Sequence, residues 1–328
     1  MRALQLVEYG RFELKDLPRP QPKEDEVLIR VSVCGICGSD VHGMDGSTGR
    51  RLPPIVMGHE AAGEIMEIGA AVEGWKIGDR VTFDSTVYCG RCPYCLRGEI
   101  NLCDNRKVLG VSTPEFRMDG AYAEYVAVPA RILYRLPDNL SYEHAAMVEP
   151  VSIANHAVNR AGDVSGKATA VIGAGMIGLL IVQMLKVRGA ASIVAIDLDE
   201  EKLTLARKLG ATATTFDGPV DVAIEAVGIQ PTINAAIENT RKGGKIVLVG
   251  NLSPRVEVPL QAIVSRELDV LGSAACCGEY PDSLQMIADG RIQVDPLISG
   301  HSTLDEAAHW FDRLYKGEKG LMKVMVCP

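Results

Sequence analysis

The fold of this chain is decided by the stretch Thr169-Ala-Val-Ile172-Gly173-Ala-Gly175-Met176-Ile177-Gly178. Its first four residues form an apolar, β-branched run that predicts a short buried strand, and residues 179–188 have helical spacing. A second strand is predicted at 192–196, and it ends at Asp197. Strand, glycines, helix, strand and acid follow one another in the order of a dinucleotide-binding βαβ unit.

Each glycine of this turn has a physical role in such a unit. The three allow the tight turn, the close approach of a pyrophosphate to the backbone, and close packing of helix on strand, with the phosphates at the positive helix N-terminus. Asp197 follows Gly178 by nineteen residues and can bind both ribose hydroxyls, whereas its charge would repel a 2′-phosphate. NAD is therefore favoured over NADP. The expected cofactor contacts in this region are Gly173, Gly175, Met176, Ile177, Gly178, Asp197, Val227, Val249 and Gly250.

The alternation of strands and helices continues to about residue 290 and predicts a doubly wound parallel sheet. Further strands are expected at 212–216, 222–225, 245–250 and 268–272, with helices at 202–209, 231–239 and 283–289. The link 217–221 is too short for a crossover helix, so a stretched connection is expected there.

The residues before this region predict an irregular, mostly β domain. A strand is expected at 27–33 and another at 120–128, and Ser141 is expected to begin a helix that ends near Glu149 and Pro150. Pro150 suits the first turn of a following helix at 151–161. Near the C-terminus a helix at 304–315 and a strand at 323–326 complete the pattern.

Composition restricts the possible partners and compartment. The length of 328 residues predicts two domains, and the formal net charge of −8 gives no basic surface for nucleic acid or an anionic membrane. No export signal or membrane-spanning run is recognised. Nine clustered cysteines in such a chain indicate metal binding in a reducing compartment, so a cytoplasmic protein is expected.

Four cysteines form the most specific motif of the sequence. Cys89, Cys92, Cys95 and Cys103 lie within fifteen residues, and their spacing lets one loop surround a single ion. Four thiolates in a tetrahedron form a closed structural zinc site without a position for substrate. Packing cysteines or an iron–sulfur cluster are the less favoured interpretations.

A second group of residues has the composition of a catalytic zinc site. Cys37 offers a thiolate, His59 a nitrogen, and Glu60 and Glu149 offer carboxylates. One Cys, one His and one or two carboxylates leave a coordination position for water or substrate. Taken alone, Glu149 could simply be an acid near a helix N-terminus.

Together these motifs resemble the zinc-dependent medium-chain alcohol dehydrogenase family, closest to its sorbitol and polyol dehydrogenase branch. The resemblance covers nearly the whole chain. It implies a GroES-like catalytic domain formed by 1–152 and 293–328, including the structural zinc lobe 89–103, with a Rossmann domain at 153–292 inserted between them. By resemblance Cys37 and His59 bind zinc, and Glu60 and Glu149 do so directly or through water.

The resemblance also implies the remaining chemical roles. Ser39 and His42 match the proton relay, while Asp197 and Lys202 match the ribose-binding pair. The expected reaction is hydride transfer from a secondary alcohol, such as a polyol or sugar alcohol, to NAD in a homodimeric or homotetrameric enzyme with two zinc ions per chain.

One departure from the polyol branch affects the choice of substrate. Polyol enzymes carry an arginine after the position of Gly272, and the run Ser273-Ala-Ala-Cys-Cys277 contains none. A threonine-type or butanediol-type dehydrogenase is therefore the main alternative. A zinc-free quinone reductase would lack the cysteine lobe, and a non-catalytic nucleotide-binding protein would not need the chemical residues.

Overall fold

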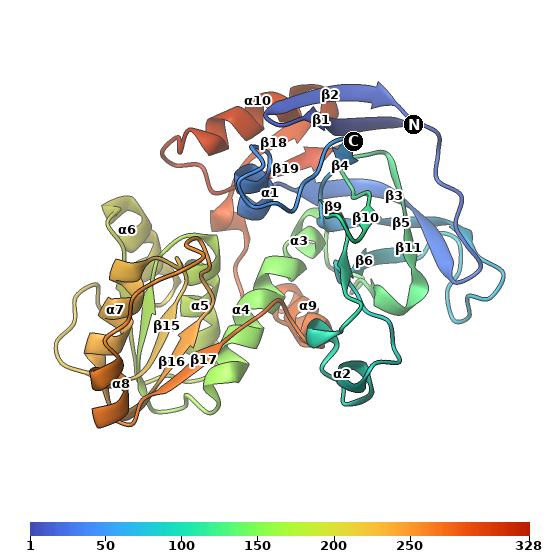
Figure 1. Cartoon of the computed structure of the whole chain (residues 1–328). Coiled ribbons are helices and arrows are strands. Elements are labelled where there is room, and N and C mark those ends of the chain that lie inside the picture. Colours follow the sequence, from blue (N-terminus) through green and yellow to red (C-terminus); the bar gives the residue numbers. More distant parts are fainter. The chain divides into compact units, whose positions relative to one another are not determined.

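The computed structural model describes residues 1–328, and the chain forms two compact units (Figure 1). The first unit comprises Met1–Glu149, Tyr280–Ala288 and Val294–Pro328, and the second comprises Pro150–Glu279 and Asp289–Gln293. Segment 280–288 thus groups with the first unit, although the sequence analysis places it in the Rossmann domain. The sequence predicts that 1–152 and 293–328 form the catalytic domain and that 153–292 form the nucleotide-binding domain. This assignment of roles stays a prediction.

A seven-stranded sheet organises the first unit. Its strands follow the order β12 (Leu133–Arg135), β6 (Arg80–Phe83), β5 (Glu60–Ile68), β3 (Glu26–Gly35), β19 (Lys323–Cys327) and β18 (Ile298–Thr303), with β11 (Tyr125–Pro129) also paired to β3. The C-terminal strand β19 therefore lies antiparallel beside β3, which is formed by the N-terminal part of the chain. This pairing brings residues from both ends of the sequence to the same end of β3.

The other elements of the first unit are short. Its smaller sheets consist of β1 (Arg2–Glu8), β2 (Arg11–Asp16) and β4 (Ile55–Val56); β9 (Val111–Ser112) and β10 (Arg117–Met118); and β7 (Thr86–Val87) and β8 (Lys107–Val108). Its helices are α1 (Gly38–Gly43), α2 (Pro93–Leu96), α3 (Tyr142–Ala146), α9 (Tyr280–Ala288) and α10 (Leu304–Tyr315), with 3-10 turns at Ile100–Leu102, Ala130–Ile132 and Asp295–Leu297. The core lies between the sheets and α10, where the buried rings of Tyr122 and Phe311 meet edge to face.

A five-stranded parallel sheet organises the second unit. Its order is β14 (Ser192–Ile196), β13 (Ala168–Ile172), β15 (Val220–Glu225), β16 (Thr240–Leu248) and β17 (Asp269–Gly272). The helices are α4 (Val148–Ala161), α5 (Met176–Val187), α6 (Glu200–Leu209), α7 (Gln230–Asn239) and α8 (Leu260–Ser265). The direction of strand order reverses at β13, because β14 lies on one side of it and β15 on the other.

The helices cover both faces of this sheet. Ile233, Ala236 and Ile237 of α7 pack against strand residues such as Ala223 and Ile246 on one face. Helix α5 lies on the opposite face, and its residues from Gly178 to Leu185 are buried (Figure 1). A parallel sheet covered on both faces, in a chain whose other unit is a mostly antiparallel β structure, confirms the predicted fold class.

Three local predictions need correction. Segment 212–216 forms no strand, because only an isolated bridge between Val194 and Ala213 remains there. The strand predicted at 120–128 begins only at Tyr125. The helix opened by Ser141 ends at Ala146, and the next helix already starts at Val148, so that Glu149 and Pro150 both lie in its first turn.

Some local signals were correctly interpreted. The Ser141 side chain accepts a hydrogen bond of 3.1 Å from the backbone N–H of His144, as an N-cap should. Strand β14 and helix α10 have the predicted bounds. No helix combines the length and apolar character needed to cross a membrane.

Candidate zinc and nucleotide sites

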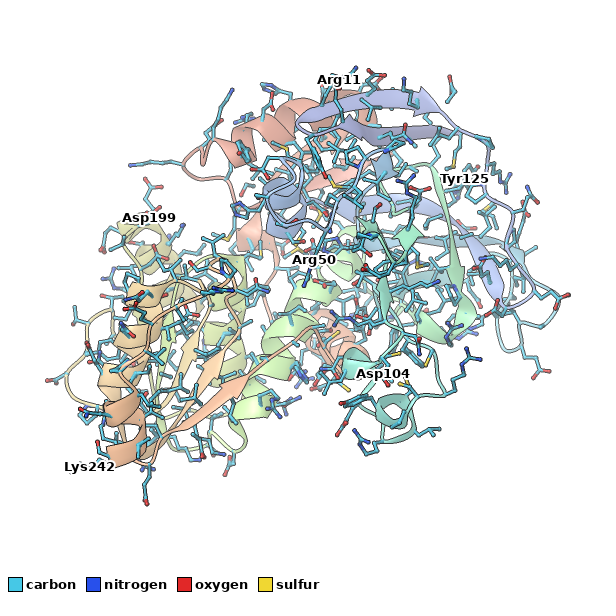
Figure 2. All side chains as sticks on the ribbon, in the orientation of Figure 1. Arg11, Arg50, Asp104, Tyr125, Asp199 and Lys242 are labelled. Atoms are coloured by element: carbon cyan, nitrogen blue, oxygen red, sulfur yellow. The ribbon has the colours of Figure 1, made fainter.

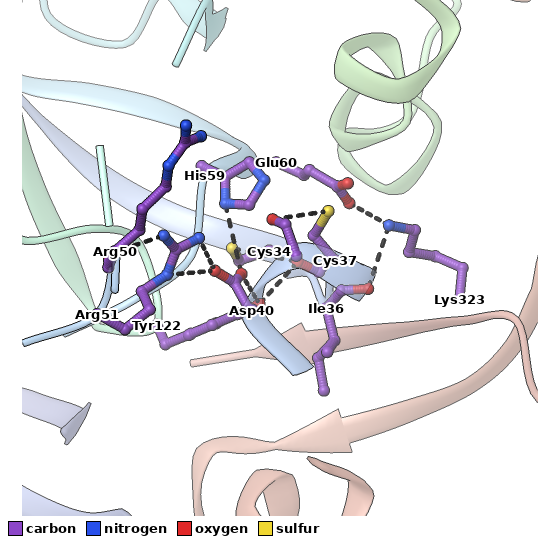
Figure 3. Close-up of polar contacts among 12 residues, drawn as sticks. Cys34, Ile36, Cys37, Asp40, Arg50, Arg51, His59, Glu60, Tyr122 and Lys323 are labelled. Carbon is purple, nitrogen blue, oxygen red and sulfur yellow. Dashed lines mark hydrogen bonds and ion pairs between the residues drawn. The ribbon is translucent and has the colours of Figure 1, made fainter. Parts of the chain in front are cut away.

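Cys37 lies where β3 gives way to a short helix. It precedes Gly38, the first residue of α1, and has extended backbone angles that suit an N-cap position. His59 and Glu60 lie at the start of the neighbouring strand β5, and Glu60 pairs in register with Gly35 at the end of β3. The ligand atoms of Cys37, His59 and Glu60 all lie within 4.8 Å of one another. The structure therefore brings together three of the four predicted ligands of the catalytic zinc (Figure 3).

Glycine at position 35 makes this close arrangement possible. A Cβ atom there would lie 2.6 Å from Oε2 of Glu60, which is closer than real contacts allow. The Glu60 carboxylate thus passes directly over the backbone of β3.

Glu60 has a buried cationic partner that the sequence analysis did not identify. Lys323, the first residue of β19, forms an ion pair with Oε2 of Glu60 and donates a hydrogen bond of 3.1 Å to the carbonyl of Ile36. The two side chains are only 2% and 1% exposed. Burial lowers the pKa of Lys323, but Glu60 and Cys37 outweigh burial and raise it, so the ammonium group stays charged.

His59 has an acidic neighbour of its own. Its Nδ1 atom lies 3.4 Å from Oδ2 of Asp40, a fully buried residue of α1. That nitrogen is buried and makes no hydrogen bond of normal geometry. Burial lowers the pKa of His59, but Asp40 and Cys37 together raise it well above the ordinary value.

Asp40 is held in place from two further sides. Arg51 donates hydrogen bonds of 3.1 and 2.6 Å to its Oδ1, and the Tyr122 hydroxyl lies 2.9 Å from its Oδ2. Burial raises the pKa of Asp40, but His59 and Arg51 outweigh it and hold the pKa well below its usual range. A carboxylate that orients a ligating histidine in this way also makes the imidazole a better metal ligand.

Glu149 does not belong to the close group of ligand atoms. It lies partly buried in the first turn of α4, where Glu60, His59 and Lys323 all influence its ionisation. Burial and the neighbouring Glu60 raise its pKa to about 7. Its role as a zinc ligand stays a prediction.

The two predicted relay residues are exposed on α1. The Ser39 hydroxyl donates a hydrogen bond of 3.3 Å to the sulfur of Cys37. His42 lies one helical turn further along, and its side chain is exposed. Hydrogen bonds from Ser47 lower the pKa of Asp45, and the nearby His42 adds to this effect. The positions agree with a path from the metal side of α1 to water, but the relay itself stays a prediction.

The four remaining predicted metal ligands gather in one loop. The sulfur atoms of Cys89, Cys92, Cys95 and Cys103 lie within 4.8 Å of one another, and Figure 2 shows sulfur atoms gathered near Asp104. Backbone N–H groups of Cys89 and Asn105 donate to Cys103 at 3.2 and 3.4 Å. Hydrogen bonds from backbone N–H groups, chiefly that of Arg91, lower the pKa of Cys89 to about 6.

Both groups fit zinc by the chemistry of their donors. Thiolates stabilised by N–H groups suit a closed tetrahedral site, and a Cys–His–carboxylate set leaves positions open for other ligands. None of the nine cysteines forms a disulfide, so all of these sulfurs remain able to bind a metal ion.

The glycine turn has the geometry that a dinucleotide needs. Gly173 has a φ angle of 96°, and a Cβ atom at Gly178 would lie 1.7 Å from the carbonyl oxygen of Gly173. Around Gly175 no atom lies within 4 Å of where a Cβ would be, so the backbone is open to a ligand there. Met176 and Ile177 begin helix α5, whose N-terminus faces this space.

The other predicted cofactor residues follow the carboxyl ends of the strands. Asp197 follows β14 directly and accepts hydrogen bonds from the backbone N–H groups of Ala174 at 2.7 Å and Asp199 at 3.0 Å. Lys202 lies partly buried at the start of α6. These contacts join Asp197 to the glycine turn, as a ribose-binding acid requires, although its contact with a cofactor stays a prediction.

The loops after β15 and β16 touch each other. The buried Glu225 accepts hydrogen bonds from the N–H groups of Val227 and Gly228 at 2.9 and 2.8 Å. A Cβ atom at Gly250 would lie 2.2 Å from the nitrogen of Gly228. Val227, Val249 and Gly250 therefore lie together at the carboxyl edge of the sheet.

Four residues of the first unit's site were missed by sequence reasoning: Asp40, Arg51, Tyr122 and Lys323. Asp40 could have been found from its position one helical turn after Cys37. Lys323 begins an otherwise apolar strand, and a charged residue in such a strand is seldom buried unless paired. Nothing local to Arg51 or Tyr122 indicates their contacts.

Comparison with known families gives two matches. The family described as alcohol dehydrogenase GroES-like domain matches residues 23–138, and the zinc-binding dehydrogenase family matches residues 177–289. Together they cover more than half of the chain.

Similar proteins of known name belong to the polyol branch. The chain is 34% identical to sorbitol dehydrogenase of Bacillus subtilis over 100% of this chain and 97% of that protein. It is 36% identical to D-arabitol-phosphate dehydrogenase of Enterococcus avium over 97% of this chain and 94% of that protein.

Solved structures have the same fold. A dehydrogenase from Sinorhizobium meliloti with NADP bound superposes with a TM-score of 0.91 at 34% identity, over 100% of this chain and 99% of that one. The 2R,3R-butanediol dehydrogenase of Bacillus subtilis gives a TM-score of 0.89 at 31% identity, over 100% and 99%. The predicted family is thereby confirmed: this chain belongs to the zinc-dependent medium-chain alcohol dehydrogenases, in their polyol dehydrogenase branch.

Proposed function

We propose that this chain oxidises a secondary alcohol, of the polyol or sugar alcohol class, to a ketone with NAD as the hydride acceptor. The observation that carries the proposal is the close group of Cys37, His59 and Glu60 in a chain that also contains an open glycine turn. Cys37, His59, Glu60 and Glu149 would hold the catalytic zinc, and the four cysteines of the loop would hold a structural one.

When bound, zinc supplies a positive charge that makes an alcohol hydroxyl acidic near neutral pH, and NAD supplies the hydride acceptor. The side chains act around them. Asp40 and Arg51 fix the orientation of His59, and Lys323 holds the Glu60 carboxylate. Ser39, which is bonded to the Cys37 sulfur, would accept the hydroxyl proton, and the exposed His42 would pass it to water.

The preference for NAD is supported by Asp197. Its carboxylate lies at the end of β14 beside the glycine turn, where a 2′-phosphate would meet a negative charge. Similar structures were solved with NADP and with NADH, so the fold accepts either cofactor and the acid is the feature that favours NAD.

The main alternative substrate is a diol or a hydroxy amino acid. The residue at 275 is Ala with a φ angle of 54°, in a segment without the arginine of polyol enzymes, and a butanediol dehydrogenase is among the similar structures. The metal and cofactor chemistry would be the same for both classes.

Reduction of NAD tested against sugar alcohols, phosphorylated polyols, inositols, diols and amino alcohols distinguishes these substrates. The proposal expects NADH formation with a polyol and a loss of at least about a hundredfold in kcat/KM for Cys37→Ser, while NADH binding is retained. Retained activity in this variant, or in protein freed of zinc, would contradict the assignment.

We also propose that the enzyme works in the cytoplasm as a homodimer or homotetramer. Nine cysteines without a disulfide support a reducing compartment. Light scattering of the purified protein measures the oligomeric state.

A further inference from the structure

The segment that follows β17 lies at the ligand-binding edge of the second unit's sheet. In open parallel sheets, ligands bind beyond the carboxyl ends of the strands, next to the point where strand order reverses. The reversal lies at β13, with Asp197 after β14 on one side. A dinucleotide whose adenosine half lies at Asp197, beyond β14, must extend along the sheet edge toward β15, β16 and β17. Neighbouring strands are only about 4.8 Å apart, so an extended dinucleotide passes several of them. Segment 273–279 therefore belongs to the nicotinamide end of the edge.

Both ends of this segment are attached to helix α4. At its start, the Arg160 guanidinium donates a hydrogen bond of 3.0 Å from Nε to the carbonyl of Gly272. At its end, Oε1 of Glu279 lies 2.7 Å from Nδ1 of His156 and accepts a bond of 3.2 Å from the amide of Asn159. We call His156, Asn159 and Arg160 the α4 clamp; they lie on one face because residues three and four apart are neighbours on a helix.

The contact between His156 and Glu279 is buried, whereas Asn159 and Arg160 reach it from the exposed side of α4. Glu279 is 8% exposed and His156 9%. The other oxygen of Glu279 accepts a hydrogen bond from the backbone N–H of Cys277, inside the segment. Burial raises the pKa of Glu279, but His156, the Cys277 N–H and Asn159 outweigh it and lower the pKa, so the carboxylate is ionised at neutral pH.

The backbone between the two attachments is unusual. Ala275 has a φ angle of 54°, a conformation that residues other than glycine rarely adopt, and Gly278 has one of 89°. Such a conformation persists only where surrounding contacts determine it. The α4 clamp supplies contacts at both ends of the segment.

We propose that the α4 clamp, acting through Glu279, holds segment 273–279 in the conformation that receives the nicotinamide half of the dinucleotide. Glu279 is thus a positioning residue for cofactor binding. The inference rests on the proposed use of NAD and adds a determinant outside the glycine turn. A segment that is already ordered binds its ligand without the entropic cost of ordering it first.

The test compares two ligands on the same variants. NADH contains the nicotinamide half and ADP-ribose lacks it, so only NADH should need the segment. Dissociation constants are measured by NADH fluorescence and by competition with ADP-ribose, using full-length protein with its zinc content verified. Glu279→Ala should weaken NADH binding about tenfold and leave ADP-ribose binding unchanged. Glu279→Gln can still accept from the Cys277 N–H and should stay near the wild-type value.

The matched control is Asp221, an acid at the opposite end of the same sheet. It accepts a hydrogen bond of 2.9 Å from the N–H of Ala168 and one of 2.6 Å from the side chain of Arg241. Asp221→Ala should lower the melting temperature without changing the affinity for either ligand.

Three results would overturn the inference. The first is a Glu279→Ala variant that loses thermal stability while binding NADH as tightly as the wild type. The second is equal weakening of NADH and ADP-ribose, which would indicate general damage to the unit. The third is a wild-type protein that binds no NADH, which would first refute the proposed function.

Discussion

Replacing Glu149 by Gln should stabilise the first unit when the catalytic zinc is absent, by an amount that grows with pH. Burial and the neighbouring Glu60 raise the pKa of Glu149 from 4.5 to about 7, although His59 and Lys323 act in the opposite direction. A carboxyl whose pKa is higher in the folded state than in the unfolded state holds its proton more tightly when folded. Its ionisation therefore opposes folding.

The size and pH range of this effect follow from the two pKa values. Below pH 4.5 both states keep the proton, and Glu149 has no effect. Between there and about pH 7 the free energy of unfolding falls by about 1.36 kcal/mol for each pH unit. Above about pH 7 the loss is constant, at up to about 3 kcal/mol. Glutamine carries no such charge, so the variant should keep this free energy.

The assay is urea unfolding followed by tryptophan fluorescence. Both tryptophans, Trp75 and Trp310, belong to the first unit, so the signal reports that unit alone. The protein is prepared with one zinc per chain, so that the cysteine loop stays intact. At pH 8 the midpoint of Glu149→Gln should exceed that of the wild type by about 1–2 M urea, and at pH 5 the two should nearly coincide.

A control and a second titration complete the experiment. Glu306→Gln, an exposed change on α10, should shift neither midpoint. Restoring the catalytic zinc should stabilise the wild type more than Glu149→Gln if the carboxylate binds the ion. An equal difference between Glu149→Gln and the wild type at pH 5 and pH 8 would refute the reasoning about its burial.

Three further changes test the other parts of the site. Asp40→Asn should reduce zinc affinity or kcat/KM by about 10- to 100-fold, because His59 loses its orienting carboxylate, and competition with a chelator measures the affinity. Asp197→Ala should raise the ratio of NADP to NAD activity, and an unchanged ratio in steady-state kinetics would contradict the role of that acid. Cys95→Ser should remove one zinc per chain in metal analysis and lower the melting temperature, since a structural zinc contributes directly to folding.

The features that sequence predicted well are those whose signal is local. The turn from Gly173 to Gly178 follows from steric limits within a few residues, and the structure shows the close approach of Gly178 to the Gly173 carbonyl. The four cysteines of the loop likewise lie within fifteen positions, and their sulfurs meet.

The failed strand prediction has a physical reason. Segment 212–216 has the β-branched residues of a strand, and its backbone does bond β14, from the Thr212 N–H to the Ile193 carbonyl at 2.8 Å and from the Ala195 N–H to the Ala213 carbonyl at 2.9 Å. The N–H of Ile193, however, donates to the Thr212 hydroxyl and not to a backbone carbonyl, so the pairing stays a single bridge. Only five residues then separate the segment from Val222. The residue types of 212–216 correctly indicated an extended backbone. Whether that backbone pairs as a strand depends on the adjacent strands, which residue propensity does not describe.

The Lys323 contact shows which part of the Glu60 environment the sequence could predict. The position of Glu60 beside the predicted metal ligands was predictable, but the cation that balances its buried charge was not. Its carboxylate neighbours His59 in sequence, while its cationic partner comes 263 residues later through the pairing of β19 with β3. Buried charges are tolerated only when they are paired. With Cys37, Glu60 and Glu149 ionised around a divalent ion, the group would carry one surplus negative charge, and Lys323 removes it. A lysine within an apolar terminal strand is therefore evidence for a buried acid elsewhere in the chain, and here that acid is Glu60, a predicted ligand of the catalytic zinc.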